Sequence, residues 1–425
     1  MNEWHRLTAV EAARRLARRE LSAEALLRSC LERIAAREPE VRAFAHLDAD
    51  AALAQARALD AGPLRGLLHG LPLGVKDILD TADQPTACGT PIYAGHRPPA
   101  DAAPVALARG AGAVIAGKTV TTELANMTAG VTRHPLNPAH SPGGSSSGSA
   151  AAVADFMLPL ALGTQTAGSI VRPAAYCGVV GFKPSFGRAP RAGVKPNAES
   201  MDVVGGFGRT VEDAALLAAV LLGDRRALDE PVPETFRLGL APGPDRDHAA
   251  DDVIACWQQA VRVLAPRLAR CEDAALPADV ADIAALQGAL QAHETALSLA
   301  HEHRVHRERL SPALLELLDR GAALDAVQVE ALRARAARWR SDVDTLFERF
   351  DVLLAPSTRD TAPAGLAFTG DPLYCRPWSL LGLPCVHLPF ARGANGLPVG
   401  LQLVGRKGED HRVLAAAKRA MAWLG

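Results

Sequence analysis

The 425-residue chain is 48% hydrophobic, so it is long and apolar enough to bury a large core. Its 46 basic and 47 acidic side chains nearly cancel and only 4% of its residues are aromatic, which argues against binding to nucleic acid. The longest apolar stretch, residues 150–163, is broken by Asp155 and Pro159 and is too short to cross a membrane. Residues 1–5 lack the character of a signal peptide and the seven cysteines form no CxxC pair, so we expect a cytoplasmic protein with no membrane partner.

The N-terminal part predicts helices, and the middle of the chain predicts strands that alternate with helices. Capping residues open helices at residues 12–19 and 22–37, and Pro39 is expected to end the second one. Apolar runs predict strands at residues 41–47, 71–75, 113–116, 158–162 and 236–240. Further helical patterns occupy residues 102–109, 147–156 and 211–222. This alternation predicts an α/β fold around a parallel or mixed sheet.

The C-terminal part returns to strands after a long helical region. Residues 223–235 are a candidate connection, and helical patterns then fill residues 247–269, 278–320 and 326–350. Strands are expected at residues 351–355, 385–389 and 399–404, followed by a helix over residues 409–423. Because strands lie on both sides of the helices, we expect one domain over residues 1–425, with residues 247–350 as a mainly helical insertion.

Two short motif matches have simpler structural explanations. Residues 112–119 satisfy the Walker A string, but their middle residues form an apolar strand pattern rather than a phosphate-binding loop. Residues 144–148 satisfy the G-x-S-x-G string, but a nucleophile elbow follows a strand, whereas here a proline-broken loop comes first. We therefore assign neither a nucleotide site nor an elbow nucleophile at Ser146.

A third cluster suggests metal binding but lacks the necessary spacing. His301, His303 and His306 lie among glutamate and arginine residues on a polar helical pattern without an HExxH arrangement. A solvated helix face explains them better, so no metal site is predicted.

Two serine- and glycine-rich turns and one lysine are the most informative features. Residues 141–154 begin with Ser-Pro-Gly-Gly-Ser-Ser-Ser-Gly-Ser and continue into a predicted helix of small residues. Residues 163–173 form a second polar turn after an apolar strand. Consecutive backbone N–H groups in such a turn suit an anionic oxygen. Lys76 ends the strand at residues 71–75, and it is one of only six lysines among the basic residues. A flexible linker and a surface lysine are the structural alternatives.

Together these segments resemble the amidase signature family. The resemblance covers residues 71–77, 141–183 and 396–410, and Gly117-Lys118-Thr119 with Glu123 matches a strand-end sequence of the family. It implies an α/β/α layered single domain with a central mixed β-sheet. Within it, residues 70–223 would form the core that carries the catalytic residues.

The resemblance implies a Ser-Ser-Lys triad. Ser169 corresponds to the nucleophile, Ser145 to a bridging serine that follows a cis peptide after Gly144, and Lys76 to the base. A serine hydroxyl is a poor nucleophile until a base removes its proton, and a buried lysine can be neutral enough to do so. Neutral Lys76 would accept a proton from Ser145, which accepts one from Ser169, and water would later hydrolyse the acyl-enzyme.

The second turn corresponds to the oxyanion hole of the family. The backbone N–H groups of Thr166, Ala167, Gly168 and Ser169 would hold the oxyanion, and Thr164 would supply a supporting hydroxyl. The family usually has two glycines before the nucleophile. The extra Cβ of Ala167 is therefore expected to narrow the hole or to restrict the backbone.

Arg172 is the candidate for substrate recognition. Many family members have an arginine two residues after the nucleophile, but here it lies three residues after Ser169. This spacing resembles the malonamidase-like branch, in which an arginine binds a substrate carboxylate. If a helix began near Ser169, the two residues would share a face and Arg172 would point into the pocket. A structural ion pair is the alternative.

The function implied is an amidase that hydrolyses the C–N bond of a small molecule, with a carboxylate-bearing amide as the candidate substrate. The mechanism requires neither a cofactor nor a metal, and the family suggests a homodimer. Two other functions stay open. The chain could be the catalytic subunit of a glutamine-dependent amidotransferase complex, or an inactive binding paralogue.

Overall fold

Residues 3–241 and 243–425 are described by a computed structural model, in which one large mixed sheet runs through the whole molecule. Its eleven strands have the order β1-β3-β2-β4-β6-β5-β10-β11-β9-β7-β8. The strands are β1 (Phe44–Leu47), β2 (Pro72–Lys76), β3 (Val114–Thr119), β4 (Leu160–Gln165), β5 (Val180–Lys183), β6 (Val203–Gly208), β7 (Arg237–Leu240), β8 (Arg270–Asp273), β9 (Val352–Pro356), β10 (Cys385–Arg392) and β11 (Pro398–Gly405). The predicted α/β class with a mixed sheet is confirmed.

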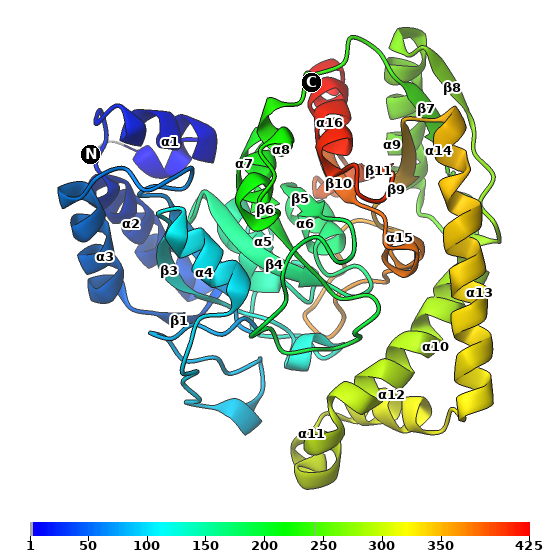
Figure 1. Cartoon of the computed structure of the whole chain (residues 1–425), viewed down its shortest axis with the longest axis horizontal. Coiled ribbons are helices and arrows are strands. Elements are labelled where there is room, and N and C mark those ends of the chain that lie inside the picture. Colours follow the sequence, from blue (N-terminus) through cyan, green and yellow to red (C-terminus); the bar gives the residue numbers. More distant parts are fainter. Residues whose placement is uncertain (1–2, 242) are drawn as a thin grey trace.

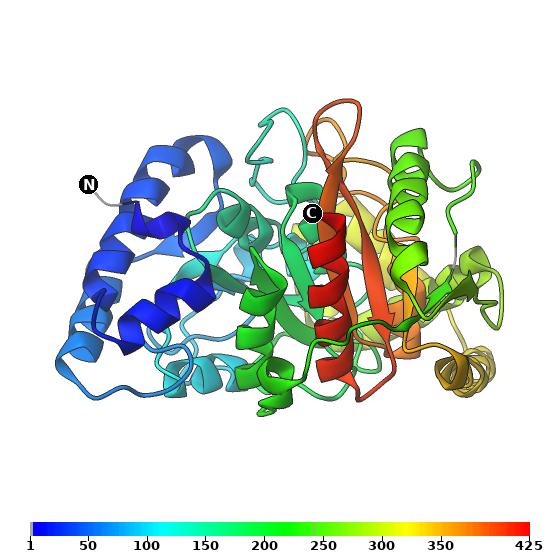
Figure 2. The ribbon, with the colours of Figure 1, turned by 90° about the horizontal axis from the view of Figure 1, so that it is seen from above.

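Helices cover both faces of this sheet (Figures 1 and 2). The helices are α1 (Ala9–Ala17), α2 (Ala23–Val41), α3 (Ala49–Ala61), α4 (Ala103–Gly110), α5 (Ser147–Ala154), α6 (Val171–Cys177), α7 (Val211–Leu221), α8 (Arg226–Asp229), α9 (Asp251–Leu264), α10 (Val280–Ser298), α11 (Ala300–Val305), α12 (Pro312–Ala322), α13 (Ala326–Asp344), α14 (Leu346–Arg349), α15 (Arg376–Leu381) and α16 (Asp410–Leu424). Short 3-10 helices occupy Trp4–Arg6, Pro91–Tyr93, Glu123–Ala125, Ala265–Arg267 and Arg307–Arg309. In the parts of the chain that the structure describes, no helix combines the length and the apolar character needed to cross a bilayer.

Alternating residues of β4 show how the layers are held together. Ala161 packs in a buried cluster with Ala150 of α5, whereas its neighbour Leu162 pairs with Gly206 of β6, where an added Cβ would lie 2.4 Å from Leu217 of α7. Because successive side chains of a strand point to opposite faces, α5 and α7 lie on opposite sides of the sheet.

All eight predicted strands overlap observed strands, but several helices differ in their bounds from the prediction, as two examples show. Pro39 does not end α2, which continues to Val41 and stops where Arg42 adopts a φ of 53°. The carboxylate of Glu38 accepts hydrogen bonds from the N–H groups of Ala43 and Phe44, both at 2.9 Å, and so stabilises this end. The helical pattern over residues 278–320 forms three helices rather than one, because the chain breaks near Leu299 and Ser311 caps α12.

The insertion predicted at residues 247–350 contains α9 to α14 and also the edge strand β8. β8 pairs parallel with β7, so this segment also contributes to the common sheet. Figure 1 shows α10 to α13 extending as a helical arm at one end of the molecule. His301 and His303 lie on α11 of this arm, and the His303 ring contacts Asp319 at 2.9 Å.

The neighbouring strands β2 and β4 position the site. They pair in parallel, so their C-terminal ends meet at one edge of the sheet. Lys76 is the last residue of β2, and Thr164 is the penultimate residue of β4. Ligand sites of α/β sheets characteristically lie at such carboxyl ends.

Candidate active site

Lys76 is fully buried, and its side-chain nitrogen contacts two hydroxyl groups. Nζ donates hydrogen bonds to Ser145 Oγ at 2.6 Å and to Thr164 Oγ1 at 2.8 Å. Burial lowers the pKa of Lys76 well below its ordinary value, Asp202 opposes this shift, and the positive charge of Arg172 adds to it. Since both hydrogen-bond partners are neutral, neither offsets the cost of a buried charge, and the lysine is poised to accept a proton.

A second buried lysine shows the contrasting arrangement. Lys118, on the adjacent strand β3, forms an ion pair with Asp77 at 3.1 Å and donates to Thr86 Oγ1 at 2.6 Å. It belongs to the residues that match the Walker A string, and these form β3 itself rather than a phosphate loop. Lys118 therefore has an ionic partner inside the core, whereas Lys76 faces the serine loop.

The loop before α5 carries Ser145 and Ser146 in different environments. The Gly144–Ser145 peptide bond is cis, as the resemblance implies, and Ser145 is only 2% exposed. The Ser146 hydroxyl donates to the carbonyl oxygen of Thr164 at 3.2 Å and accepts from the Thr164 N–H at 3.3 Å. Ser146 thus joins the loop to β4, while Ser145 presents its hydroxyl to Lys76.

The turn that carries Ser169 connects β4 to α6 and is held by Gln165. Gln165 Oε1 accepts hydrogen bonds from the N–H groups of Ile170 and Val171 at 2.9 and 3.0 Å, and its Nε2 donates to the Ala167 carbonyl at 3.1 Å. Ser169 is 8% exposed on this turn. Sequence reasoning did not single out Gln165, although its place four residues before Ser169 within the motif was a usable signal.

Two distant side chains bind the carbonyl groups of the same turn. Gln287 Nε2 of α10 donates to the Thr166 carbonyl at 3.2 Å, and Ser379 Oγ of α15 donates to the Ala167 carbonyl at 2.7 Å. Because a trans peptide unit directs its C=O and N–H to opposite sides, the N–H groups of Ala167 and Gly168 point away from these helices. Sequence reasoning missed both side chains, which lie outside the motifs.

The replacement of a glycine by Ala167 is accommodated without backbone strain. Ala167 does not have a positive φ, so its Cβ imposes no left-handed conformation. At the next position a Cβ would lie only 3.0 Å from Cys375 Cβ and 3.1 Å from Pro372 Cβ. Gly168 is therefore the position at which a side chain would crowd the turn.

Arg172 is buried, and its donors engage backbone carbonyl groups. Nε and Nη2 both donate to the Gly144 carbonyl, at 3.2 and 2.7 Å, and Nη1 donates to the Gly370 carbonyl at 2.7 Å. The regular helix α6 begins at Val171, just after Ser169, and the Arg172 N–H donates to the Gly168 carbonyl at 2.9 Å. These partners are backbone carbonyl groups and not the carboxylate of the alternative structural ion pair.

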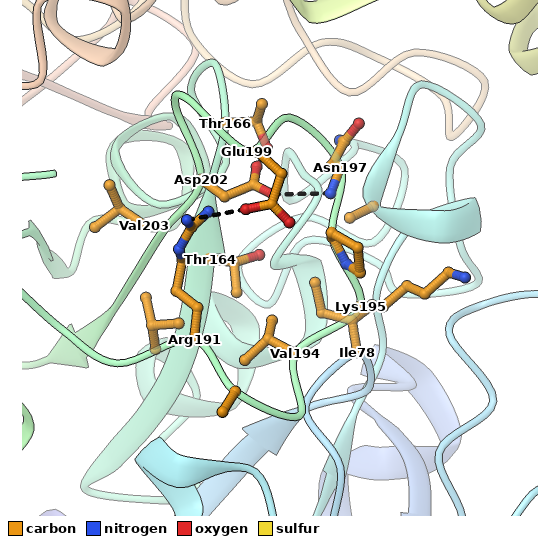
Figure 3. Close-up of a pocket in the computed structure, with 14 residues that line it drawn as sticks. Ile78, Thr164, Thr166, Arg191, Val194, Lys195, Asn197, Glu199, Asp202 and Val203 are labelled. Atoms are coloured by element: carbon orange, nitrogen blue, oxygen red, sulfur yellow. Dashed lines mark hydrogen bonds and ion pairs between the residues drawn. The ribbon is translucent and has the colours of Figure 1, made fainter. Parts of the chain in front are cut away.

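A cavity of about 280 Å³ borders the turn, and Thr164 and Thr166 line it (Figure 3). The Thr166 hydroxyl donates to Asp202 Oδ1 at 2.6 Å, and Asp202 Oδ2 accepts from the Asn197 N–H at 2.8 Å. Burial raises the pKa of Asp202, whereas these hydrogen bonds lower it. The cavity therefore adjoins both the hydroxyl that binds Lys76 and one residue of the expected oxyanion hole.

The sequence profile of the Amidase family matches residues 25–414. The chain is 37% identical over 481 aligned positions to a Glutamyl-tRNA(Gln) amidotransferase subunit of Acidothermus cellulolyticus, covering 97% of this chain and 93% of that protein. It is also similar to the crystal structure of an amidase, with a TM-score of 0.89, 34% identity and coverage of 99% and 100%.

A peptide amidase from Stenotrophomonas maltophilia is similar as well, with a TM-score of 0.82 and 28% identity over 98% of this chain and 96% of that one. The agreement in sequence and in fold extends over nearly the whole chain rather than over one motif. This protein therefore belongs to the amidase signature family, whose enzymes hydrolyse the C–N bond of amides.

Proposed function

We propose that the chain hydrolyses a small-molecule amide, with Ser169 as the nucleophile, Ser145 as the proton relay and Lys76 as the base. The observation that carries this proposal is the fully buried Lys76, which is hydrogen-bonded to Ser145 at 2.6 Å. Burial disfavours the ammonium form and lowers the pKa, which favours a lysine that accepts a proton.

The first half of the reaction forms an acyl-enzyme. Neutral Lys76 accepts the proton of Ser145 as Ser145 accepts that of Ser169, and the Ser169 oxygen attacks the amide carbon. The N–H groups of residues 166–169 stabilise the oxyanion, and the contacts of Gln287 and Ser379 support this role because they fix the turn from behind. The C–N bond then breaks, and the proton returns through Ser145 to the leaving nitrogen.

In the second half, water replaces the amine. The same relay removes a proton from water, which attacks the acyl carbon and releases the carboxylic acid and Ser169. Every proton is carried by the chain's own groups, and Lys76 ends the cycle neutral.

For Arg172 we propose a positioning role. Its two hydrogen bonds to the Gly144 carbonyl hold the peptide that precedes Ser145. Arg172→Lys is then expected to slow an acidic amide (succinamate) and a neutral one (butanamide) alike. Selective loss of succinamate hydrolysis would instead favour the carboxylate contact of the malonamidase-like branch, which the spacing between Ser169 and Arg172 supports.

An ammonia-release screen over small amides, run with wild type and Ser169→Ala, tests the main proposal. Turnover that disappears in Ser169→Ala but persists in Ser146→Ala supports it. Ser146 is a matched control because it is a buried serine in the adjacent loop. Equal turnover in wild type and Ser169→Ala would refute the assignment of the nucleophile.

A second candidate function is the glutamine-hydrolysing component of an amidotransferase complex. The similarity to a component of a Glutamyl-tRNA(Gln) amidotransferase over 97% of the chain favours it. Glutamate release from glutamine, with activity that requires companion proteins, would distinguish it from a self-sufficient amidase. Failure of Ser169 to react with a serine-directed phosphonate would favour an inactive binding paralogue.

A further inference from the structure

Two successive carbonyl groups of the turn between β4 and α6 are held in unequal ways. The Ala167 carbonyl accepts from Gln165 Nε2 at 3.1 Å and from Ser379 Oγ at 2.7 Å. Among the described side chains, Gln287 alone donates to the Thr166 carbonyl, through Nε2 at 3.2 Å. Because a peptide unit is planar, the direction of the Thr166 carbonyl also fixes the direction of the Ala167 N–H. That N–H therefore depends on the orientation of the Gln287 amide.

Arg376, the first residue of α15, determines how this amide is oriented. Its Nη1 donates to Gln287 Oε1, which leaves Gln287 Nε2 to face the Thr166 carbonyl. Turning the amide over would set its NH₂ group against the guanidinium and its oxygen against the carbonyl, and neither pair can form a hydrogen bond. Gln291 Oε1 also accepts from this Nε2, at 3.1 Å, but an amide can present either an oxygen or a nitrogen, whereas a guanidinium has only donors. Burial lowers the pKa of Arg376 to about 10, so the guanidinium keeps its N–H donors at neutral pH.

Gly288 gives independent support, because it leaves room for the guanidinium beside α10. A Cβ at this position would lie 3.2 Å from Arg376 Nη1 and 3.9 Å from Arg376 Cζ. Gly288 lies within a 19-residue helix, where glycine is less favourable than alanine, and it does not have a positive φ that would require glycine. The close approach of Arg376 supplies the reason for a glycine here.

We propose that Arg376 is a positioning residue for the oxyanion hole. It fixes the Gln287 amide, and this amide holds the peptide between Thr166 and Ala167 with its N–H toward the reacting oxygen. The inference rests on the proposed function, in which the N–H groups of residues 166–169 stabilise the oxyanion. No bond to Arg376 forms or breaks. Because the negative charge on the oxygen develops in the transition state, loss of this orientation should lower kcat more than it changes KM.

The test measures hydrolysis of butanamide and the rate at which a fluorophosphonate labels Ser169. The phosphonate needs the same nucleophile and the same oxyanion hole, so its labelling rate decides the matter even if butanamide is a poor substrate. Arg376→Met should lower kcat and the labelling rate about 10–100-fold, with KM changed less than about 3-fold, because one donor of the hole loses its orientation. Arg376→Lys should recover part of both rates, because an ammonium group also has only donors.

Arg340→Met is the matched control. Arg340 is also a partly buried arginine, and its Nε donates to the Leu380 carbonyl of the same helix α15 at 2.8 Å, without a link to the turn. We expect this variant to leave both rates within about 3-fold of wild type.

Two variants on α10 test the same contact without altering Arg376. Gln287→Glu can still bind Arg376 but cannot donate to the Thr166 carbonyl, so it should lose as much kcat as Arg376→Met at an unchanged or higher melting temperature. Gly288→Ala should favour the helix but displace the guanidinium, and we expect it to lower kcat about 3-fold or more. In an Arg376→Met background, Gly288→Ala should have no further effect on kcat.

An Arg376→Met enzyme whose kcat and labelling rate stay within about 3-fold of wild type would overturn the inference. A Gln287→Glu enzyme as active as wild type would overturn it as well. Failure of the proposed function gives a different result, because wild type itself would then neither hydrolyse amides nor react with the fluorophosphonate, or Ser169→Ala would match it. In that case both proposals are wrong.

Discussion

Replacement of Lys76 by arginine tests the proton relay directly. Arginine stays protonated in proteins, so Lys76→Arg keeps a positive charge beside Ser145 but cannot accept a proton. Loss of a positioned general base lowers rates on the order of 10²–10⁴-fold, or about 3–5 kcal/mol in the barrier. The fully buried site has no space prepared for the larger guanidinium, so we expect a loss of at least about 10³-fold for both Lys76→Arg and Lys76→Met.

The proton relay also predicts the direction in which activity changes with pH. Only neutral Lys76 is active, so kcat/KM should rise with pH along an acid limb whose midpoint lies below the ordinary pKa of lysine, because burial lowers the pKa. The charge of Asp202 raises the Lys76 pKa and that of Arg172 lowers it, so Asp202→Asn should move the limb to lower pH and Arg172→Met to higher pH. Initial rates of amide hydrolysis across pH measure both shifts. A Lys76→Arg enzyme whose kcat/KM is within about 10-fold of wild type would refute the role of Lys76 as the base. A shift of the acid limb to higher pH in Asp202→Asn would refute the electrostatic argument.

Three further substitutions separate catalysis from folding. Ser169→Ala should abolish turnover at an unchanged melting temperature. Ser146→Ala should stay active but lose about 1 kcal/mol of stability, because its hydrogen bonds to the backbone are lost. The reverse pattern would favour Ser146 as the nucleophile of a G-x-S-x-G elbow. Lys118→Met should lower the free energy of unfolding, measured by urea denaturation, by about 3–5 kcal/mol, because Asp77 stays buried without its ionic partner. A loss below about 1 kcal/mol would contradict this expectation. Gly148→Ala would place a Cβ 2.1 Å from the Ala43 carbonyl oxygen, so we expect the free energy of unfolding to fall by about 1–3 kcal/mol or more. An unchanged melting temperature would contradict this and would show that α5 can shift.

Two of the three strands that sequence analysis missed, β6 and β8, lack the apolar alternation on which it depends. β8 has the sequence Arg-Cys-Glu-Asp and lies at the sheet edge with mostly exposed side chains, so its strand character comes from pairing with β7. β6 contains three glycines, which are poor strand formers in isolation. A Cβ at Gly205 would lie 2.2 Å from the Phe182 carbonyl, and one at Gly206 would lie 2.6 Å from the Ala161 carbonyl. Close packing against β5 and β4 selects these glycines, and a local pattern does not reveal that packing.

The site was predictable to the extent that it lies within contiguous motifs. Lys76 and Ser145 were identified by their motifs, and the structure brings them into contact although 69 positions separate them. The contacts that hold the oxyanion turn come from Gln287 and Ser379, which are 121 and 212 positions away from the carbonyl groups they bind. No spacing rule connects such residues, because α10 and α15 lie next to the turn only in the folded chain.

Arg172 shows that the contacts of a buried side chain do not follow from its spacing in the sequence. The spacing after Ser169 predicted a substrate contact for Arg172, and in the structure the guanidinium donates to the Gly144 carbonyl. In the proposed mechanism it acts from there in two ways. It fixes the peptide that presents Ser145, and its charge lowers the pKa of Lys76. If Lys76 is the base, a buried cation that binds carbonyl groups favours its neutral form, since it disfavours a second positive charge without accepting the proton itself.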